Sequence, residues 1–392
     1  MITATALSQG KYRPPAGLKE LRDFLQAALE VEHFTVPVYM SGMYSIRPGA
    51  NRFSYDTIRS VLMEEMLHLT LAANLLNAVG GTPDVARPGF VAGYPARLPF
   101  SSRSLPEIPL QNFSPAALDT FLLIERPRAL VPPAGGEAED DEGWTSIGQF
   151  YDAIRKGLIA LEREQREQHR RDPAAPATLF TGDPRRQVGP TDFYNSGGEA
   201  FPVTDLKSAL LAVEVISDQG EGVADTIWDS DDIFFGEQRQ VAHYFRFKEI
   251  RVGRRYGAHD LPRTGPSGPL LDVVWDEAYR IDPRAKVAHY PEGSQVRAQA
   301  EFFNRTYAHL LALLQLAFTG DPWVMRQAVP VMLELRDLSQ RLYRNPHPDR
   351  ARAAQGIHAS PTFELTEQHF VQARADAAAK AAASPTPEEQ HP

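Results

Sequence analysis

The 392-residue sequence predicts an all-α protein, a helical bundle with long loops and additional C-terminal helices. Apolar residues recur at steps of three and four along several long segments, which is the spacing of one face of an α-helix. Glycine, proline and N-capping residues bound these segments. No series of strands and no internal repeat is visible. Helices are therefore expected to form both the core and the layer around it.

The two N-terminal helices carry the clearest apolar stripes. The first is predicted over residues 18–43, after Pro14-Pro15, and Pro37 is expected to kink it because proline removes a backbone hydrogen bond. Its stripe consists of Leu21, Leu25, Ala28, Val36, Tyr39 and Met43. The second helix is predicted from an N-cap at Ser54 to the break at Gly80, with a stripe running from Ile58 to Val79.

Six further helices are predicted from apolar periodicity and from the residues that bound it. Helical periodicity, bounded by serine, aspartate, glycine or proline, is found in six further segments. These are residues 114–126, 146–169, 205–220, 237–251, 294–318 and 321–343. Long segments rich in proline and glycine lie between them, and long loops inside a domain are often functional. The main ones are residues 82–113, 128–145, 171–203 and 257–294.

These segments divide the chain into four parts. Residues 1–17 form an N-terminal lead, and residues 18–255 form the bundle with its long loop insertions. Residues 256–366 form a loop and a helical pair expected to pack on the bundle. Residues 367–392 are low in complexity and are expected to be disordered.

Composition excludes several classes of protein. A net charge of −9 and a pI near 5.7 argue against a nucleic-acid or anionic-membrane partner. The absence of cysteine excludes disulfides, zinc–thiolate sites, iron–sulfur clusters and a thiol nucleophile, so any metal must be held by His, Asp and Glu. We see no signal peptide and no run of about 18 apolar residues, and we expect a cytoplasmic protein.

Ionisable residues interrupt the apolar stripes of the first two helices. At roughly 100° per residue, Glu32 falls on the stripe of the first helix, whereas His33 falls on the opposite, solvated face. Glu65 and His68 are three residues apart, and both fall within the stripe of the second helix. Glu64 points away from the centre of that stripe and is expected at the surface.

Three later helices also direct ionisable groups inward. Glu125 follows the apolar side of its short helix. Glu214 and Glu221 both lie within roughly 40° of Leu210, so periodicity does not choose between them. His243 shares a side with apolar residues of its helix.

So many buried acids require compensation, since each uncompensated one costs several kcal/mol. A pair of metal ions supplies it, because carboxylate and imidazole suit iron and manganese. Two residues at i and i+3 project from one helix face, so Glu65 and His68 can reach one metal. Four-helix bundles with dinuclear carboxylate sites use this arrangement. In the alternative, the acids pair with arginines, as Glu125 would with Arg128.

Several segments resemble a known family. They include "LEVEHFTVPVYMSGMYSIRPG", "EEMLHLTLAANLLNAVGGTP", "FLLIERP", "ISDQGEG" and "HYFRFKEI", and with further blocks they span roughly residues 18 to 364 in order. The chain resembles the ferritin-like domain of iminophenyl-pyruvate dimer synthases, which are related to the violacein and rebeccamycin pathway enzymes. The resemblance implies a ferritin-like four-helix bundle.

The resemblance also implies a set of metal ligands. It favours Glu221 over Glu214, and Tyr39 is a candidate donor to the site from one turn beyond Val36. An acidic loop separates Glu221 from His243, which departs from the usual spacing of three. The implied ligands are Glu32, Glu65, His68, Glu125, Glu221 and His243. They would hold iron as a dinuclear centre, with manganese as the other candidate.

The implied function is that of a non-haem iron oxidoreductase of secondary metabolism. Such an enzyme couples imines of amino-acid-derived 2-oxo acids and uses dioxygen or peroxide. Two other hypotheses share the predicted fold. One is an iron-binding or storage protein, and the other is a metal-free helical scaffold whose inward acids pair with arginines.

Overall fold

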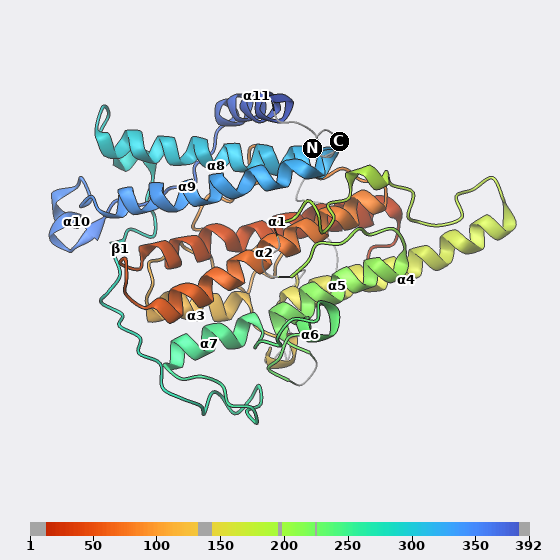
Figure 1. The fold of residues 1–392 in the computed structure, drawn as a ribbon, viewed down its shortest axis with the longest axis horizontal. Coiled ribbons are helices and arrows are strands. Elements are labelled where there is room, and N and C mark those ends of the chain that lie inside the picture. Colours follow the sequence, from red (N-terminus) through yellow and green to blue (C-terminus); the bar gives the residue numbers. More distant parts are fainter. Residues whose placement is uncertain (1–12, 132–142, 195–197, 224–225, 384–392) are drawn as a thin grey trace, which may run out of the picture.

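Two long neighbouring helices, α1 (Leu18–Ser45) and α2 (Arg52–Ala78), form the centre of the molecule (Figure 1). The computed structural model describes residues 13–131, 143–194, 198–223 and 226–383. Pro37 lies inside α1, which nevertheless continues to Ser45. The helix α2 begins two residues before the predicted cap, because Asn51 adopts a left-handed conformation (φ 44°) and ends the connection from α1.

The other two helices of the bundle are each interrupted. One consists of α3 (Pro115–Ile124) followed by α4 (Ile147–Arg171), and the other of α5 (Leu206–Glu221) followed by α7 (His243–Val252). The pieces α4 and α5 pack on each other and on α1 and α2 at one end. At the other end, α3 and α7 pack on each other and on the same two helices (Figure 1).

The ends of these pieces are fixed by side-chain caps. Ser114 and Ser146 accept hydrogen bonds from backbone N–H groups of the first turns of α3 and α4. Asp205 and Ser208 form a capping box at the start of α5. The helix predicted over residues 237–251 begins only at His243. The preceding residues instead form the short helix α6 (Asp231–Phe234) and a bridge between Trp228 and Val241.

A second layer covers the outer side of α1 and α2. The helices α8 (Gln295–Thr319) and α9 (Met325–Tyr343) lie side by side and contact α2 and α1, respectively. This layer corrects the expected position of His33 on a solvated face. The His33 side chain is buried, and its Nε2 lies 2.8 Å from the hydroxyl of Tyr307 in α8.

The C-terminal tail differs from the disorder expected for residues 367–392. Residues up to 383 form α11 (Glu367–Ala383), which packs against α8, and the residues after it lie outside the described part. Phe370, Ala373 and Ala377 are buried and lie three and four residues apart. The alanine-rich segment thus combines high helix propensity with a narrow apolar stripe that docks on the layer below.

Smaller elements complete the described chain. The helix α10 (Arg350–Ala354) precedes strand β2 (Ile357–His358), which pairs in parallel with β1 (Arg280–Ile281). Short 3-10 turns lie at residues 128–130, 184–186, 287–289 and 322–324.

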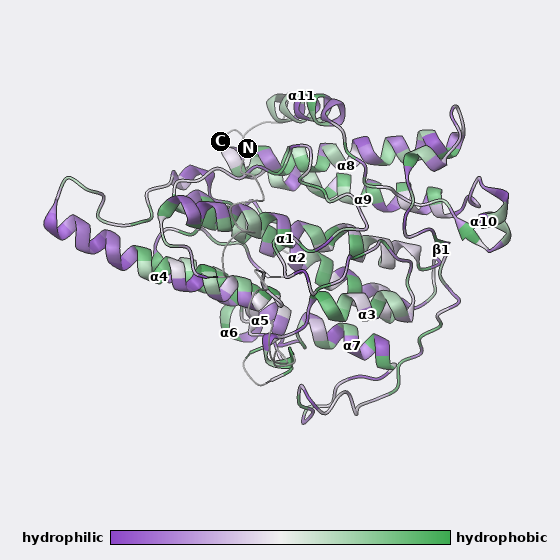
Figure 2. Ribbon diagram, turned by 180° about the vertical axis from the view of Figure 1, so that it is seen from behind, coloured by the Kyte–Doolittle hydropathy of each residue, from purple (hydrophilic) through white to green (hydrophobic). Residues whose placement is uncertain are grey.

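One hydrophobic core extends through the bundle and the layer of α8 and α9. Figure 2 shows apolar residues along the packed helices, whereas the outer end of α4 is hydrophilic and extends beyond them. Within the described ranges, none of the helices has the length and apolar character needed to cross a lipid bilayer. The expected all-α bundle with additional C-terminal helices is confirmed.

Candidate metal centre

Five predicted ligands meet in the middle of the bundle and form two groups of three. One triad consists of Glu32, Glu65 and His68, and the other of Glu65, Glu125 and His243. Within each triad, one potential ligand atom per residue lies within 4.8 Å of the others. All five side chains are buried. Because both triads contain Glu65, the arrangement offers two neighbouring metal positions with one shared carboxylate.

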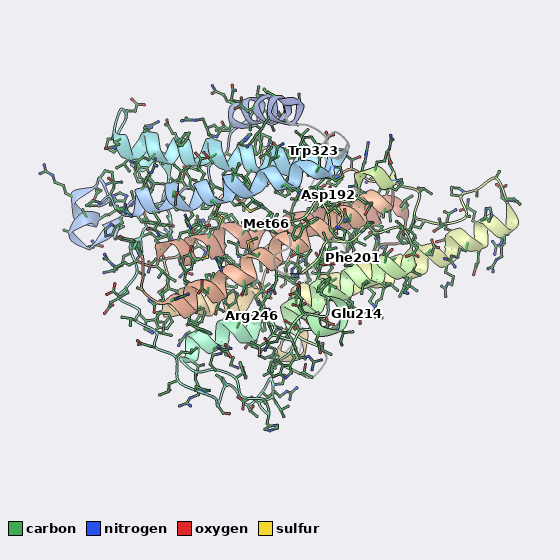
Figure 3. All side chains as sticks on the ribbon, viewed as in Figure 1. Met66, Asp192, Phe201, Glu214, Arg246 and Trp323 are labelled. Carbon is green, nitrogen blue, oxygen red and sulfur yellow. The ribbon has the colours of Figure 1, made fainter. Side chains whose placement is uncertain are left out.

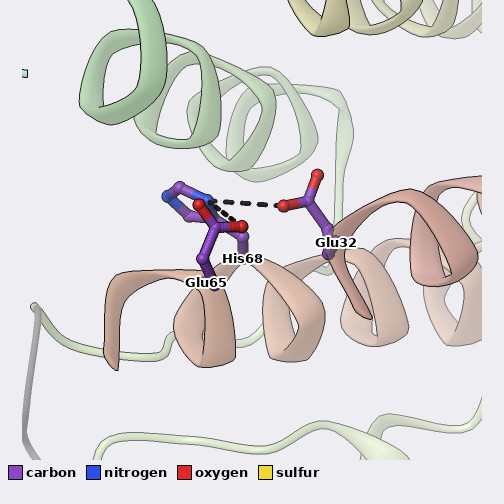
Figure 4. Close-up of side chains that lie close together, drawn as sticks. All are labelled: Glu32, Glu65 and His68. Carbon is purple, nitrogen blue, oxygen red and sulfur yellow. Dashed lines mark ion pairs between the residues drawn. The ribbon is translucent and has the colours of Figure 1, made fainter. Parts of the chain in front are cut away.

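The two oxygens of Glu65 face different histidines. Its Oε2 lies 3.9 Å from His68 Nδ1, which is also 3.5 Å from Glu32 Oε2 (Figure 4). Its Oε1 lies 3.1 Å from His243 Nδ1, which is 3.6 Å from Glu125 Oε2. The two imidazole rings are stacked, with centroids 5.5 Å apart. Glu65 would therefore help to hold an ion bound at either triad.

The interruptions of the bundle helices place two of these ligands. Glu125 is the C-cap of α3, and His243 is the first residue of α7. Glu125 thus lies where the chain leaves α3 toward α4, and His243 lies where the chain enters α7 after α5. Glu32 and Glu65, by contrast, come from the continuous helices α1 and α2.

His68 is oriented by an amide. Its Nε2 lies 2.8 Å from Gln219 Oε1, and Gln219 Nε2 donates to Asp231 Oδ1 at 2.8 Å. Since Asp231 accepts from the amide nitrogen, the amide oxygen faces the ring and His68 Nε2 carries the proton. The lone pair of Nδ1 then points at the carboxylates. This outer hydrogen bond selects the tautomer that a metal-ligating histidine requires.

His243 is oriented by a charged pair. Its Nε2 lies 2.8 Å from Glu64 Oε2, while Arg246 donates to Glu64 Oε1 at 2.6 Å. Arg246 also lies 3.2 Å from Asp229 Oδ2. Burial alone would raise the pKa of Glu64, but Arg246 and His243 outweigh it and lower that pKa to about 2. The two histidines therefore have different supports, a neutral amide for one and an ionised carboxylate for the other.

The position of Glu64 corrects the expectation of a surface residue. Glu64 is buried because α7 packs against the side of α2 that it faces. Its partners His243 and Arg246 follow it by 179 and 182 residues, so the periodicity of α2 gave no sign of them. Gln219 and Asp231 were likewise missed, since Gln219 lies near the end of α5 and Asp231 lies in α6, between α5 and α7.

The electrostatics of the cluster fit a bound cation. Burial and the neighbouring Glu125 carboxyl raise the pKa of Glu65 to about 8. The pKa of His243 is raised although burial opposes it, because Glu125, Glu64 and Glu65 surround the ring. Moreover, His243 Nδ1 is buried and lies 3.1 Å from Glu65 Oε1 without the alignment of a hydrogen bond. An unsatisfied imidazole nitrogen facing two carboxyl groups matches the donor set of an iron or manganese site.

Comparison with known proteins identifies the family of this chain. A family described as ferritin-like matches residues 25–252, which include both triads. The chain belongs to the ferritin-like family. The resemblance predicted from the sequence motifs is confirmed.

Two relatives of this ferritin-like chain carry the names of enzymes. Dichlorochromopyrrolate synthase of Lentzea aerocolonigenes is 26% identical over 358 residues, covering 83% of this chain and 31% of that protein. The 2-imino-3-(indol-3-yl)propanoate dimerase of Chromobacterium violaceum is 24% identical over 394 residues, covering 87% of this chain and 34% of that protein. The chain thus spans about a third of the length of these curated relatives.

A solved structure supports the ferritin-like fold. The crystal structure of a ferritin-like protein from Caulobacter vibrioides superposes with a TM-score of 0.57 at 22% identity. The match covers 90% of this chain and 100% of that chain.

A hydroxyl group orients each carboxyl group of this ferritin-like centre. Tyr39, predicted as a donor near the site, hydrogen-bonds to Glu125 Oε1. Tyr151 donates to Glu32 Oε1 at 2.5 Å, and Thr35 donates to Glu65 Oε2 at 3.1 Å. The sequence gave no sign of the last two, because both look like ordinary helix residues. These donors leave the second oxygen of each carboxyl group directed at a histidine.

Glu221 and Glu214 stand apart from the triads. Glu221 accepts a hydrogen bond from the Gly148 N–H at 2.9 Å and lies 3.8 Å from Arg128. A small cavity of about 20 Å³ separates it from the triads, and Glu32, Glu65, His68, Glu125 and Glu221 all line this cavity. Glu214, on the same helix, is exposed and does not border it (Figure 3). Glu221 is thus the nearer of the two alternatives, although it belongs to neither triad.

Proposed function

We propose that this ferritin-like protein is a metal-dependent oxidoreductase with two iron ions, manganese being the alternative. The observation that carries the proposal is the pair of buried triads joined by Glu65. His68 and His243 each direct Nδ1 at two carboxyl groups, which is the donor set of a carboxylate–histidine centre. When bound there, iron supplies redox chemistry toward dioxygen or peroxide and an organic substrate.

The residues of the chain perform the other tasks of such a centre. Gln219 and Glu64 hold the two imidazole rings in register with the carboxyl groups. Tyr39 and Tyr151 fix the rotation of Glu125 and Glu32. The cavity of about 20 Å³ admits a molecule of the size of water, so the helices around it exclude bulk solvent. An organic substrate has to approach from outside this cavity.

We further infer that the substrates are 2-imino acids derived from amino acids. The names of the relatives support this, since one is a dimerase of 2-imino-3-(indol-3-yl)propanoate. Coupling removes one C–H hydrogen from each of two imino acids and forms one carbon–carbon bond. The two electrons and two protons reduce one peroxide to two waters, or one dioxygen to peroxide.

Metal analysis combined with turnover tests the proposal. The protein is purified without chelator, its metals are counted, and 2-imino acids are generated in place from L-tryptophan or L-phenylalanine by an amino-acid oxidase. We expect up to two irons per chain and a dimeric product that requires them. A protein purified without metal would instead support the hypothesis of a metal-free helical scaffold. Many irons per chain without any product would support the hypothesis of an iron-storage protein.

A further inference from the structure

A second, larger cavity lies beside the metal centre. It has a volume of about 520 Å³ and is bounded by residues 127–130, the end of α5 and residues 261–264. Ser217 and Glu221 line both this cavity and the small one at the triads. Its volume falls in the range of pockets for small organic ligands, whereas the inner cavity holds only a water-sized molecule. Of these two cavities, only the outer one has room for an organic molecule.

Two arginines on the wall of this cavity are available for an anion. Arg128 lies 3.8 Å from Glu221 and 3.9 Å from Asp152, and both separations exceed a hydrogen bond. Its side chain is 56% exposed. Arg263 is also exposed, and no ion pair of it occurs within the described ranges. A planar guanidinium suits the two oxygens of a carboxylate.

The same cavity carries carboxyl groups and an apolar wall. Asp218 and Glu221 lie on the last turns of α5 and face it. Burial raises the pKa of both, to about 6 for Asp218, although Ser230 and Arg128 respectively oppose the shift. Phe245 and Leu261 supply apolar surface. A cavity with both signs of charge discriminates against a simple anion and favours a molecule that carries a positive nitrogen next to its carboxylate.

We propose that this cavity binds zwitterionic α-imino or α-amino acids. Arg128 and Arg263 pair with the carboxylate, the carboxyl groups of Asp218 and Glu221 accept the N–H of the nitrogen, and Phe245 contacts the side chain. The bound molecule then lies next to Glu221, which also lines the small cavity at the metal centre. The assignment rests on the proposed function for its substrate class, but the binding itself can be measured without turnover.

The test is calorimetric titration of the full-length protein as purified, under anaerobic conditions, with its metal content determined. The probes are L-phenylalanine, which is a stable analogue of an imino acid, and 3-phenylpropionate, which lacks the nitrogen. We expect Arg128→Gln to weaken both probes about tenfold, the loss of one charge-assisted hydrogen bond. We expect Asp218→Asn to weaken phenylalanine and leave phenylpropionate unchanged.

The control is Arg185→Gln, because Arg185 is exposed, pairs with Asp183 and lies outside the cavity. Equal affinities of wild type and Arg128→Gln for both probes would overturn the assignment, as would equal binding of the two probes by the wild type. Neither result would contradict the proposed metal content or the proposed coupling reaction, which are measured separately. Conversely, binding that depends on Arg128 in a protein without iron or coupling would uphold the cavity and reject the proposed function.

Discussion

Glu64 Oε2 lies 2.8 Å from His243 Nε2, on the side of the imidazole opposite to Glu65 and Glu125. The contact makes an ionised carboxylate the outer partner of one histidine, while the other histidine, His68, has a neutral amide. An imidazole that donates to a carboxylate is a stronger base and a stronger metal ligand. The two triads are therefore chemically different, although each offers two carboxyl groups and one histidine.

Substituting Glu64→Gln tests this difference. The amide keeps an acceptor for His243 Nε2 but removes the negative charge, so we expect one of two metal ions to bind about tenfold or more weakly. Competition with a chelator measures both affinities. Glu162→Gln is the control, because Glu162 of α4 is equally buried but lies outside both triads. It accepts hydrogen bonds from the Thr178 hydroxyl and the Leu179 N–H. Equal loss at both metal positions would contradict the asymmetry.

Glu65 and Glu125 should differ in how many metal ions they control. Glu65 belongs to both triads, whereas Glu125 belongs to one. We therefore expect Glu65→Ala to abolish metal binding. We expect Glu125→Ala to keep the metal ion bound at the triad that contains His68. Metal analysis gives the stoichiometry, and far-UV circular dichroism checks that the helices persist. A Glu65→Ala variant with the full metal content would reject the assignment of the site.

The success and failure of the sequence predictions have a common physical origin. Glu65 and His68 were predicted because both interrupt one apolar stripe, and a stripe is a property of a single helix. Glu64 was misplaced because α7 packs on a face of α2 that periodicity marks as polar, and His33 because it contacts Tyr307 of α8. Their partners come from segments about 180 and 274 residues away. One sequence contains no local trace of such pairings.

The interruptions of the bundle were visible as separate predicted helices, but their packing was not. The spacing between Glu221 and His243 departs from the three residues of an uninterrupted fourth helix, and the structure explains it by the break between α5 and α7. Caps and breakers located α3, α4 and α5 to within two residues, whereas α7 begins six residues after its predicted start. That the pieces pair across the bundle, with α3 on α7 and α4 on α5, is a tertiary property that no cap encodes.

His33 should make the protein sensitive to acid. Burial lowers the pKa of His33 to about 3, and its Nδ1 has no hydrogen-bond partner in the described structure. Below pH of about 6.5 the unfolded chain binds a proton here and the folded protein does not, so folding weakens as pH falls toward 3. Relative to His33→Gln, the wild type should lose ~2 kcal/mol between pH 6.5 and 5.

Urea unfolding at several pH values measures this difference. Tyr307→Phe is the control, because it removes the hydroxyl beside His33 but keeps the buried imidazole. That variant should retain the pH dependence of the wild type even if it is less stable at neutral pH. A parallel course for wild type and His33→Gln would show that His33 accepts a proton in the folded state.

The docking of α11 can be tested with two adjacent residues. Phe370 is fully buried between α11 and the layer below it, whereas Val371 is 57% exposed. Truncating a buried phenylalanine costs about 3–5 kcal/mol, while an exposed valine costs little. We therefore expect Phe370→Ala to release α11, with faster amide hydrogen exchange over residues 367–383, and Val371→Ala to leave exchange unchanged. Equal exchange in both variants would mean that α11 is held by other contacts than its apolar stripe.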